Sequence, residues 1–286
     1  MAVKWNHFVV VGTLATFLFG SATSGSAQSP QQGQQQPPQP AQNQEPNPAP
    51  LSMDTTPAAT PEEETAYKAV QQAADPNKRI QLGEDFLQKY PKSRYRPAMY
   101  QALVSGYFAT QQVPKMLDAG EKEIEINPND APILAVLGQT LARTYKPNAP
   151  DAAKQLDKAE LYAKRAIDIT PTLTKPENLT EDAFSNAKND TLAMAHSGLG
   201  LVYIRRGKFN EAIPELEQSV KSDSHPEPDP VNYYLLGVAD KQTSHFDAAA
   251  AAFSKCASLQ SSLQAACKSS AEEAKKQSSS QLSAPN

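Results

Sequence analysis

The chain has 286 residues, with 27 Lys and Arg against 31 Asp and Glu, which gives a formal net charge of −4 at pH 7. This mildly acidic balance argues against a nucleic-acid partner, because binding to phosphates requires clustered Lys and Arg on a basic domain.

The first 27 residues predict a secretory signal peptide. Lys4 precedes an uncharged apolar run from Phe8 to Phe19, and small residues follow as far as Ala27. The run is shorter than the roughly 20 apolar residues that cross a bilayer, so we expect no permanent membrane span. Cleavage fits best after Ala27, with Ala22 as a second position. The mature protein is then expected in the periplasm of a Gram-negative bacterium, with association to the envelope as an option. A signal that is not cleaved and acts as an inner-membrane anchor is the alternative.

Residues 28–60 predict a disordered linker. From Gln28 to Pro50 the segment consists mainly of Gln and Pro, and Glu45 is its one charged residue. Such a composition cannot bury a core, and it favours an extended, partly polyproline-like tether. A spacer is the simplest function. A reach across a cell-wall mesh is a sharper alternative, and so is a docking site for a proline-binding module, although the flanking basic residues of such a site are missing.

Residues 61–276 are long enough for one helical domain, and proline marks the ends of several of its predicted helices. Tyr90-Pro91, Asn127-Pro128 and Thr170-Pro171 each follow an apolar run of helical spacing. No strand pattern of useful length occurs. The tail from 277 to 286 is expected to be disordered.

In chain order, the pattern predicts a series of antiparallel helix hairpins. The first, over 61–74 and 76–90, is degenerate, and the second spans 97–127. The third spans 130–169 and contains a lengthened turn between its helices, after which an insertion from Pro171 delays the next hairpin. Thr180, followed by two acids, predicts the N-cap of a long helix over about 181–206. A last hairpin begins near Pro230 and leads into a final helix.

The later hairpins are related by an internal repeat of roughly 34 residues. Its recurring positions are His196, Leu199, Gly200, Phe209 and Ala212, which return as Tyr233, Leu236, Gly237, Phe246 and Ala249. This pattern resembles the tetratricopeptide-repeat family. The resemblance implies an all-α, right-handed superhelical solenoid of helix hairpins, with about four repeats, the first degenerate, and a C-terminal capping helix. Over most of residues 60–276 the chain also resembles exported tetratricopeptide proteins of acidobacteria.

The two cysteines, Cys256 and Cys267, are expected to form a disulfide in an oxidising compartment. The bridge would fasten the terminal helix to the last repeat. A redox-active or metal-binding pair is the competing interpretation, but the spacing fits neither C-x-x-C chemistry nor a zinc site.

No catalytic site, cofactor or metal is expected. No nucleophile has an identifiable base and orienting partner. The Gly198-Leu199-Gly200 sequence lies within a predicted helix, where it favours close helix packing over nucleotide binding. Gly138 and Gly237 occupy the same place in their repeats. His196 is expected to be a packed core residue.

The first helix of each repeat lines the concave face of such a solenoid, so side chains off its packing stripe are candidates for a peptide-binding groove. The candidates are Gln101, Phe108, Gln139, Arg143, Leu201, Ile204, Arg205, Tyr234, Val238 and Lys241. The Lys and Asn clamp that chaperone adaptors of the family use for a terminal carboxylate is absent. Ordinary contacts between repeats are the alternative role for all ten.

These observations predict an exported, non-catalytic scaffold that binds a protein or peptide segment in its concave groove. The alternative is a structural spacer associated with the envelope or cell wall, which acts by self-association.

Overall fold

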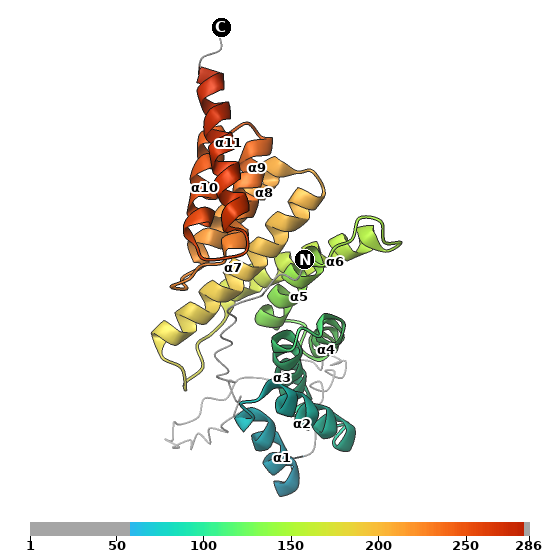
Figure 1. The fold of residues 1–286 in the computed structure, drawn as a ribbon. Coiled ribbons are helices and arrows are strands. Elements are labelled where there is room, and N and C mark those ends of the chain that lie inside the picture. The colour runs from blue at the N-terminus through green and yellow to red at the C-terminus, as the bar shows by residue number, and fades with distance from the viewer. Residues whose placement is uncertain (1–57, 283–286) are drawn as a thin grey trace, which may run out of the picture.

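The structure of this chain is a computed structural model that describes residues 58–282. Over that range it contains eleven α-helices and one short 3-10 helix, with no strand (Figure 1). The expected all-α solenoid is confirmed. The predicted signal peptide, almost all of the predicted linker and the last four residues of the chain lie outside the described residues.

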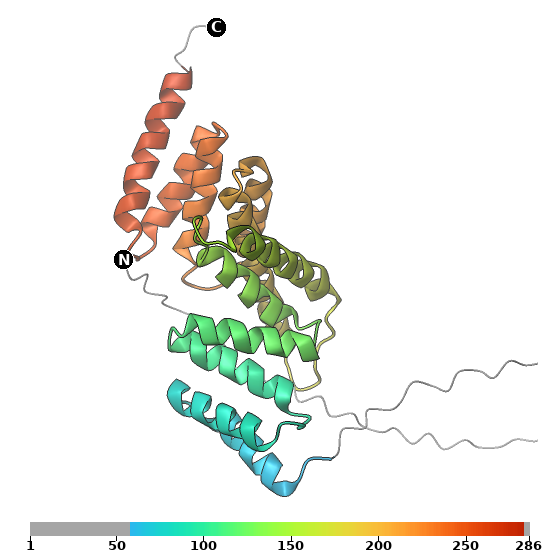
Figure 2. The ribbon, with the colours of Figure 1, turned by 90° about the vertical axis from the view of Figure 1, so that its right-hand side faces the viewer.

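The helices are consecutive, and successive pairs lie antiparallel along the stack (Figure 2). Within the described range α1 to α10 form five hairpins at the places where the pattern predicts them, against the roughly four repeats that the family resemblance implies, and α11 follows as a single helix. The helices are α1 (Pro61–Gln72), α2 (Pro76–Lys89), α3 (Arg96–Ala109), α4 (Val113–Ile126), α5 (Ala131–Arg143), α6 (Ala152–Ile169), η1 (Thr170–Thr172), α7 (Glu181–Arg205), α8 (Phe209–Ser222), α9 (Pro230–Gln242), α10 (Phe246–Ser258) and α11 (Gln264–Leu282).

Side-chain caps fix the starts of several helices. The Thr60 hydroxyl and the Asp75 carboxylate each accept a hydrogen bond from the backbone three residues on, and a proline occupies the first turn of both helices. The predicted cap at Thr180 is confirmed, since its hydroxyl accepts from the backbone N–H of Ala183. Helices α2 and α4 end before Pro91 and Pro128 as expected. At Pro171 the chain instead continues for one turn as η1.

Glycines allow the helices to approach closely. A Cβ on Gly138 would lie 2.9 Å from the backbone nitrogen of Ala163, so any larger residue would push α5 away from α6. Gly237 faces the ring of Phe253 in the same way, with the nearest ring atom 2.7 Å from the Cβ position. The packing role predicted for these glycines is therefore confirmed.

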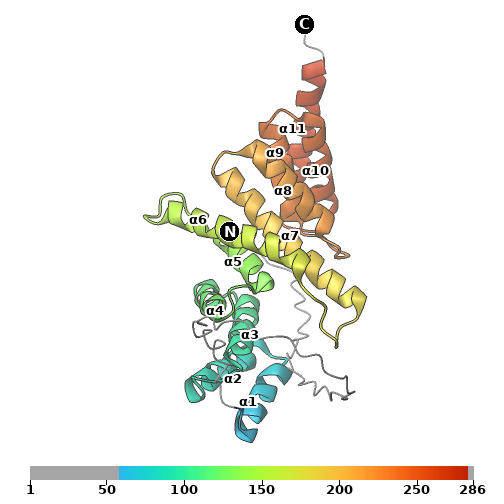
Figure 3. The same ribbon diagram turned by 180° about the vertical axis from the view of Figure 1, so that it is seen from behind.

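Helix α7 is the longest element, with 25 residues, and it crosses the middle of the molecule (Figure 3). It contacts α5 and α6 on one side and α8 on the other. The largest core cluster extends from Ile80 on α2 to Val202 on α7, whereas Tyr67 and Val70 of α1 pack with Phe86 and Met99 in a separate cluster.

Helix α11 covers the exposed end of the last hairpin. Ala271 and Ala274 are buried against Ala249, Ala250 and Phe253 of α10. The helix runs through Leu282, and its Ser278 is buried and donates a hydrogen bond to Asp247 over 2.6 Å. The predicted domain end at residue 276 is therefore wrong. Serines that look like a polar tail in the sequence continue the capping helix, because every third or fourth residue meets α10.

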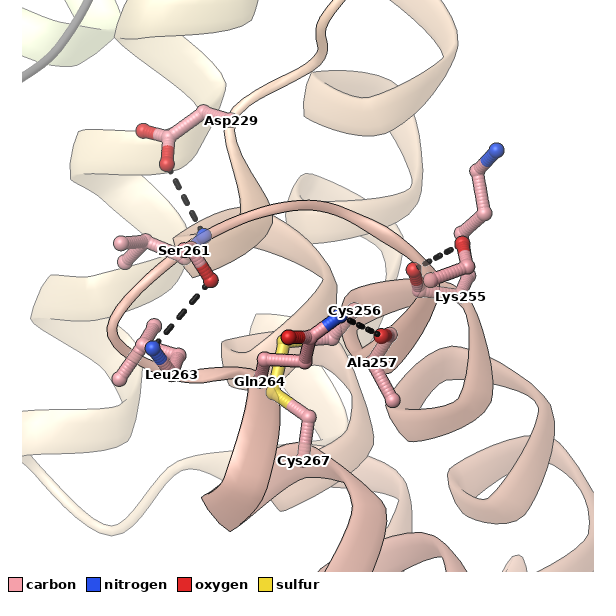
Figure 4. The surroundings of a disulfide bond; sticks show 10 residues. Asp229, Lys255, Cys256, Ala257, Ser261, Leu263, Gln264 and Cys267 are labelled. Atoms are coloured by element: carbon pink, nitrogen blue, oxygen red, sulfur yellow. Dashed lines mark hydrogen bonds between the residues drawn. A yellow bond between two sulfur atoms is a disulfide. The ribbon is translucent and has the colours of Figure 1, made fainter.

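The expected disulfide is present. Cys256 on α10 and Cys267 on α11 are bonded, their Cα atoms are 5.8 Å apart, and both residues are fully buried. Figure 4 shows the turn that joins the two helices above the bridge. The Gln264 amide donates to the carbonyl of Ala257 over 3.1 Å, and the Ser261 hydroxyl accepts from the backbone N–H of Leu263. The short turn and the bridge together hold α11 at a fixed angle against α10.

None of the helices between residues 58 and 282 is both long enough and apolar enough to span a membrane.

Candidate binding surfaces

The first helices of the hairpins, α3, α5, α7 and α9, carry all ten predicted groove residues. We call the face that these helices form the inner face. Its ten positions have different environments in the structure, and they fall into three groups: buried residues, residues in polar pairs, and residues that remain partly accessible.

Two predicted groove residues are buried. Gln139 is 7% exposed, and the backbone of α7 at Gly198 lies directly on it. Leu201 is 5% exposed and belongs to the main core cluster. Their assignment to a peptide-binding groove is therefore wrong. Because α7 is long and packs closely on α5, positions that would face a groove between shorter helices are covered by the next repeat.

Three more candidates are held in polar contacts between neighbouring elements. Gln101 donates to Asp130 over 2.5 Å, and Arg143 forms a 2.7 Å ion pair with Asp229 at the start of α9. Lys241 lies 2.8 Å from Glu273 of α11. These side chains join hairpins to one another, which agrees with the alternative role as contacts between repeats.

Tyr234, Val238 and Ile204 are half-buried and pack against core clusters. The ring of Tyr234 lies against that of Phe253, with 5.7 Å between the centroids. A substitution at Tyr234 thus disturbs the core of the last hairpin as well as the inner face. Tyr234 therefore has a structural role, whereas the sequence pattern predicts a role in binding alone.

The predicted residue with the greatest accessibility is Arg205, which is exposed at the end of α7. Its guanidinium lies over the ring of Tyr145, 5.8 Å from the centroid. Phe108 remains half-buried on α3, packed against the main core. Sequence reasoning missed Tyr145, because it follows the last turn of α5 in a segment that lacks helical spacing. We call Arg205 and Tyr145 together the inner patch.

A cavity of about 420 Å³ opens between α2, α3 and α4. Helices α2 and α4 are the second helices of their hairpins, so this pocket lies on the face opposite the inner face. Its lining residues are Glu84, Leu87, Gln88, Tyr100, Leu103, Tyr107, Lys115, Asp118, Ala119 and Lys122. Nothing in the sequence pattern points to this pocket. Its residues have ordinary helical spacing, and only the angle between the hairpins opens the space.

A buried pair of acids lies at the junction of α4 and α5. Glu123 is fully buried, and neither of its carboxyl oxygens has a hydrogen-bond partner. Asp130 is 8% exposed and caps α5 by accepting from the backbone N–H of Ile133. Burial, together with the neighbouring Asp130 carboxylate, raises the pKa of Glu123 to about 9. Burial also raises the pKa of Asp130. The raised pKa favours the protonated, neutral form of Glu123 in the folded protein.

Between residues 58 and 282, no group of three or more His, Cys, Asp or Glu side chains is arranged to hold a metal ion. His196 is half-buried and lies 2.7 Å from Glu215 across the α7–α8 hairpin, which is consistent with a packing role.

Comparison with known proteins identifies the repeat. The sequence profile of a family described as "Tetratricopeptide repeat" matches residues 195–226, the segment that comprises the second half of α7 and all of α8. No curated protein sequence matches the chain.

Among solved structures, the chain is similar to one titled "MamA RS-1 ArsTM double mutant", with a TM-score of 0.50 and 15% identity over 70% of this chain and 94% of that one. It is also matched by TTC0263, a tetratricopeptide-repeat protein of Thermus thermophilus, with a TM-score of 0.46 and 17% identity over 74% and 98% of the two chains. At this identity the first likeness establishes the fold alone.

Proposed function

We propose that the chain is a non-catalytic scaffold, which binds a segment of another protein along its inner face. The premise of this proposal is that the chain belongs to the tetratricopeptide-repeat family. Solenoids of helix hairpins are interaction scaffolds, since stacked first helices give a long continuous surface. The observation that supports this site is the inner patch. Arg205 is exposed at the end of α7 and its guanidinium lies over Tyr145. Tyr and Arg are the side chains that most often dominate binding energy at protein interfaces.

The inner patch sets the position of the partner. Most other inner-face positions between α5 and α9 are filled by contacts such as the Arg143–Asp229 ion pair. An extended peptide along the whole groove would have to displace them. We therefore propose that the partner contacts the region around the C-terminal ends of α5 and α7.

Truncation of Arg205 should weaken binding without unfolding the protein, whereas truncation of Tyr145 also removes a half-buried ring that packs against the main core. We expect Arg205→Ala or Tyr145→Ala to reduce affinity for the partner by about 1 to 2 kcal/mol, or roughly 5- to 30-fold. For the measurement, the immobilised mature protein is incubated with the envelope fraction and bound partner is crosslinked to it. The amount of partner captured is then compared between variants. Lys154→Ala, which removes an exposed cation from α6, is the matched control and should not change capture.

If all three variants capture equally, the inner patch is not the site. If the mature protein captures only further copies of itself, self-association as an envelope spacer is the better description.

We further propose that the protein is exported to the periplasm, with the predicted signal peptide removed after Ala27. The buried Cys256–Cys267 bridge supports this location, since structural disulfides persist in oxidising compartments.

The disulfide provides the test of export. When thiols are labelled after denaturation, both cysteines of protein taken from cells should be protected, and a variant without residues 1–27 should label at both.

Reduction of the purified protein should lower the stability of the last repeat by about 2 to 3 kcal/mol, because the bridge restricts the unfolded chain. Hydrogen exchange should show α11 losing protection first, while α1 to α6 stay protected. Free thiols at both positions in the exported protein would contradict the proposal.

A further inference from the structure

The pocket between α2, α3 and α4 has a few apolar side chains at its base and a lining that is otherwise polar or charged. Leu87, Leu103 and Ala119 contribute apolar side chains from all three helices, while Lys115 and Lys122 lie at the rim with side chains 58% and 48% exposed. A volume of about 420 Å³ is large enough for one or two side chains of a bound segment. Leu103 and Ala119 at the base are nearly buried, so an apolar anchor would contact mainly Leu87 and the ring of Tyr100.

The four charged residues that line the pocket are balanced, with two carboxylates and two lysines, and the excess positive charge comes from the adjoining segment. Each rim lysine is already paired: Lys115 lies 3.5 Å from Glu84, and Lys122 lies 2.7 Å from Asp118. The segment that joins α2 to α3, residues 89–96, adds Lys89, Lys92, Arg94 and Arg96. Among the described residues, no carboxylate lies within ion-pair distance of these four.

This basic segment is continuous with the pocket. Lys89 directly follows the lining residue Gln88. Arg96 holds its guanidinium 5.8 Å from the ring centroid of Tyr100, which is also a lining residue. The basic segment therefore places excess positive charge beside the pocket, although the overall charge of the chain is negative.

The aromatic rings of the segment help to identify the class of ligand. The ring of Tyr95 is stacked on that of Tyr67 with 4.2 Å between centroids, and Tyr90 packs against Phe86. Nucleic-acid binding of this basic and aromatic type needs rings that are free to stack on bases. These rings are occupied by one another, so they do not provide that surface. Cations next to a pocket with a few apolar side chains at its base instead match a peptide that carries carboxylates around an apolar side chain.

We propose that this pocket and the basic segment 89–96 form a second binding site, separate from the inner patch, for an acidic segment of a partner protein with an apolar anchor residue. The anchor enters between α2 and α4, and the carboxylates flanking it pair with Lys89 and Arg96. One chain could then hold two partner segments on opposite faces.

The probe for this site is a fluorescent heptapeptide with a central Leu between runs of Asp and Glu, titrated into the full mature protein. Two control peptides replace the Leu by Ser, or all acids by Asn and Gln. We expect the acidic Leu peptide to bind at least about tenfold more tightly than either control, with an affinity that falls as salt is added.

The protein variant combines Lys89→Gln with Arg96→Gln. This double variant should bind the acidic Leu peptide about tenfold more weakly than the wild type. Arg205→Ala, on the inner face, should leave its affinity unchanged within about twofold. Circular dichroism verifies that both variants keep the helical content of the wild type. Equal binding of the three peptides, or full affinity in the double variant, would overturn the proposal. Tighter binding of anionic lipid vesicles or RNA than of the acidic peptide, lost in the same double variant, would also overturn it and assign the basic segment to that ligand.

Discussion

Replacing Phe253 with alanine should lower the stability of the last hairpin by about 3 to 5 kcal/mol. Phe253 is 1% exposed, and its ring fills the space between Gly237 of α9 and the alanines of α11. Gly237 and the alanines have no side chain long enough to move into the gap, and Tyr234, whose ring lies against Phe253, can fill only part of it, so the cavity collapses incompletely. Each repeat of a solenoid contacts only its neighbours, so the loss should be local. Hydrogen exchange should show reduced protection in α9 to α11 and normal protection in α2 to α5.

Phe246 and Tyr234 provide the controls for this prediction. Both are half-buried, so truncation of either to alanine should cost clearly less than truncation of Phe253. Helical spacing alone favours Phe246 as the packing residue of this hairpin and Tyr234 as a binding residue. A loss at Phe246 equal to that at Phe253 would show that the core of the last hairpin lies elsewhere than described.

Replacing Glu123 with glutamine should stabilise the protein at alkaline pH. The pKa of Glu123 rises from its ordinary value of 4.5 to about 9 in the folded protein, whereas the unfolded chain gives up this proton near pH 4.5. The unfolded state therefore binds fewer protons between these two values, and the stability contributed by this group falls as pH rises through that interval. One pKa unit corresponds to about 1.4 kcal/mol, which sets an upper bound of about 5 kcal/mol at pH 8. We expect a gain of roughly 3 kcal/mol in the variant at pH 8, since some water reaches most buried acids.

The measurement is urea unfolding of both proteins at several pH values. The difference in unfolding free energy between Glu123→Gln and the wild type should be small near pH 4.5 and should grow up to about pH 9. Asp130 interacts electrostatically with Glu123, whereas carboxylates away from this junction titrate equally in both proteins, so the difference reports on the Glu123–Asp130 pair. A difference that is constant with pH would mean that Glu123 is ionised in the folded protein.

The fold was predictable from local patterns. Prolines and capping residues such as Thr180 give the boundaries of helices, because they act on the backbone within one turn. Gly138 and Gly237 indicate the close approaches of the hairpins. The disulfide was predictable from the oxidising compartment that the N-terminal sequence predicts and from the spacing of the two cysteines. The end of α11 was not, since Ser278 is an ordinary polar residue until α10 lies against it.

The candidate binding surface was only partly predictable. Whether an inner-face side chain is accessible depends on how tightly the next hairpin covers it, which is a property of the angle between helices rather than of residue type. Gln139 and Arg205 look equally suitable in the sequence. In the structure the backbone of α7 buries the first, whereas the second lies exposed at the end of that helix. Long-range pairs such as Arg143 and Asp229, 86 residues apart, carry no local signal at all.

The most direct test of the scaffold function is site-specific photo-crosslinking in intact cells. One photoreactive residue replaces Tyr145 in the inner patch, and another replaces Leu161, whose side chain is exposed on α6 with a relative accessibility of 54%. We expect a discrete adduct with a different protein from position 145 and none from position 161. No adduct from position 145, adducts only between copies of this chain, or equal adducts from both positions would contradict this expectation.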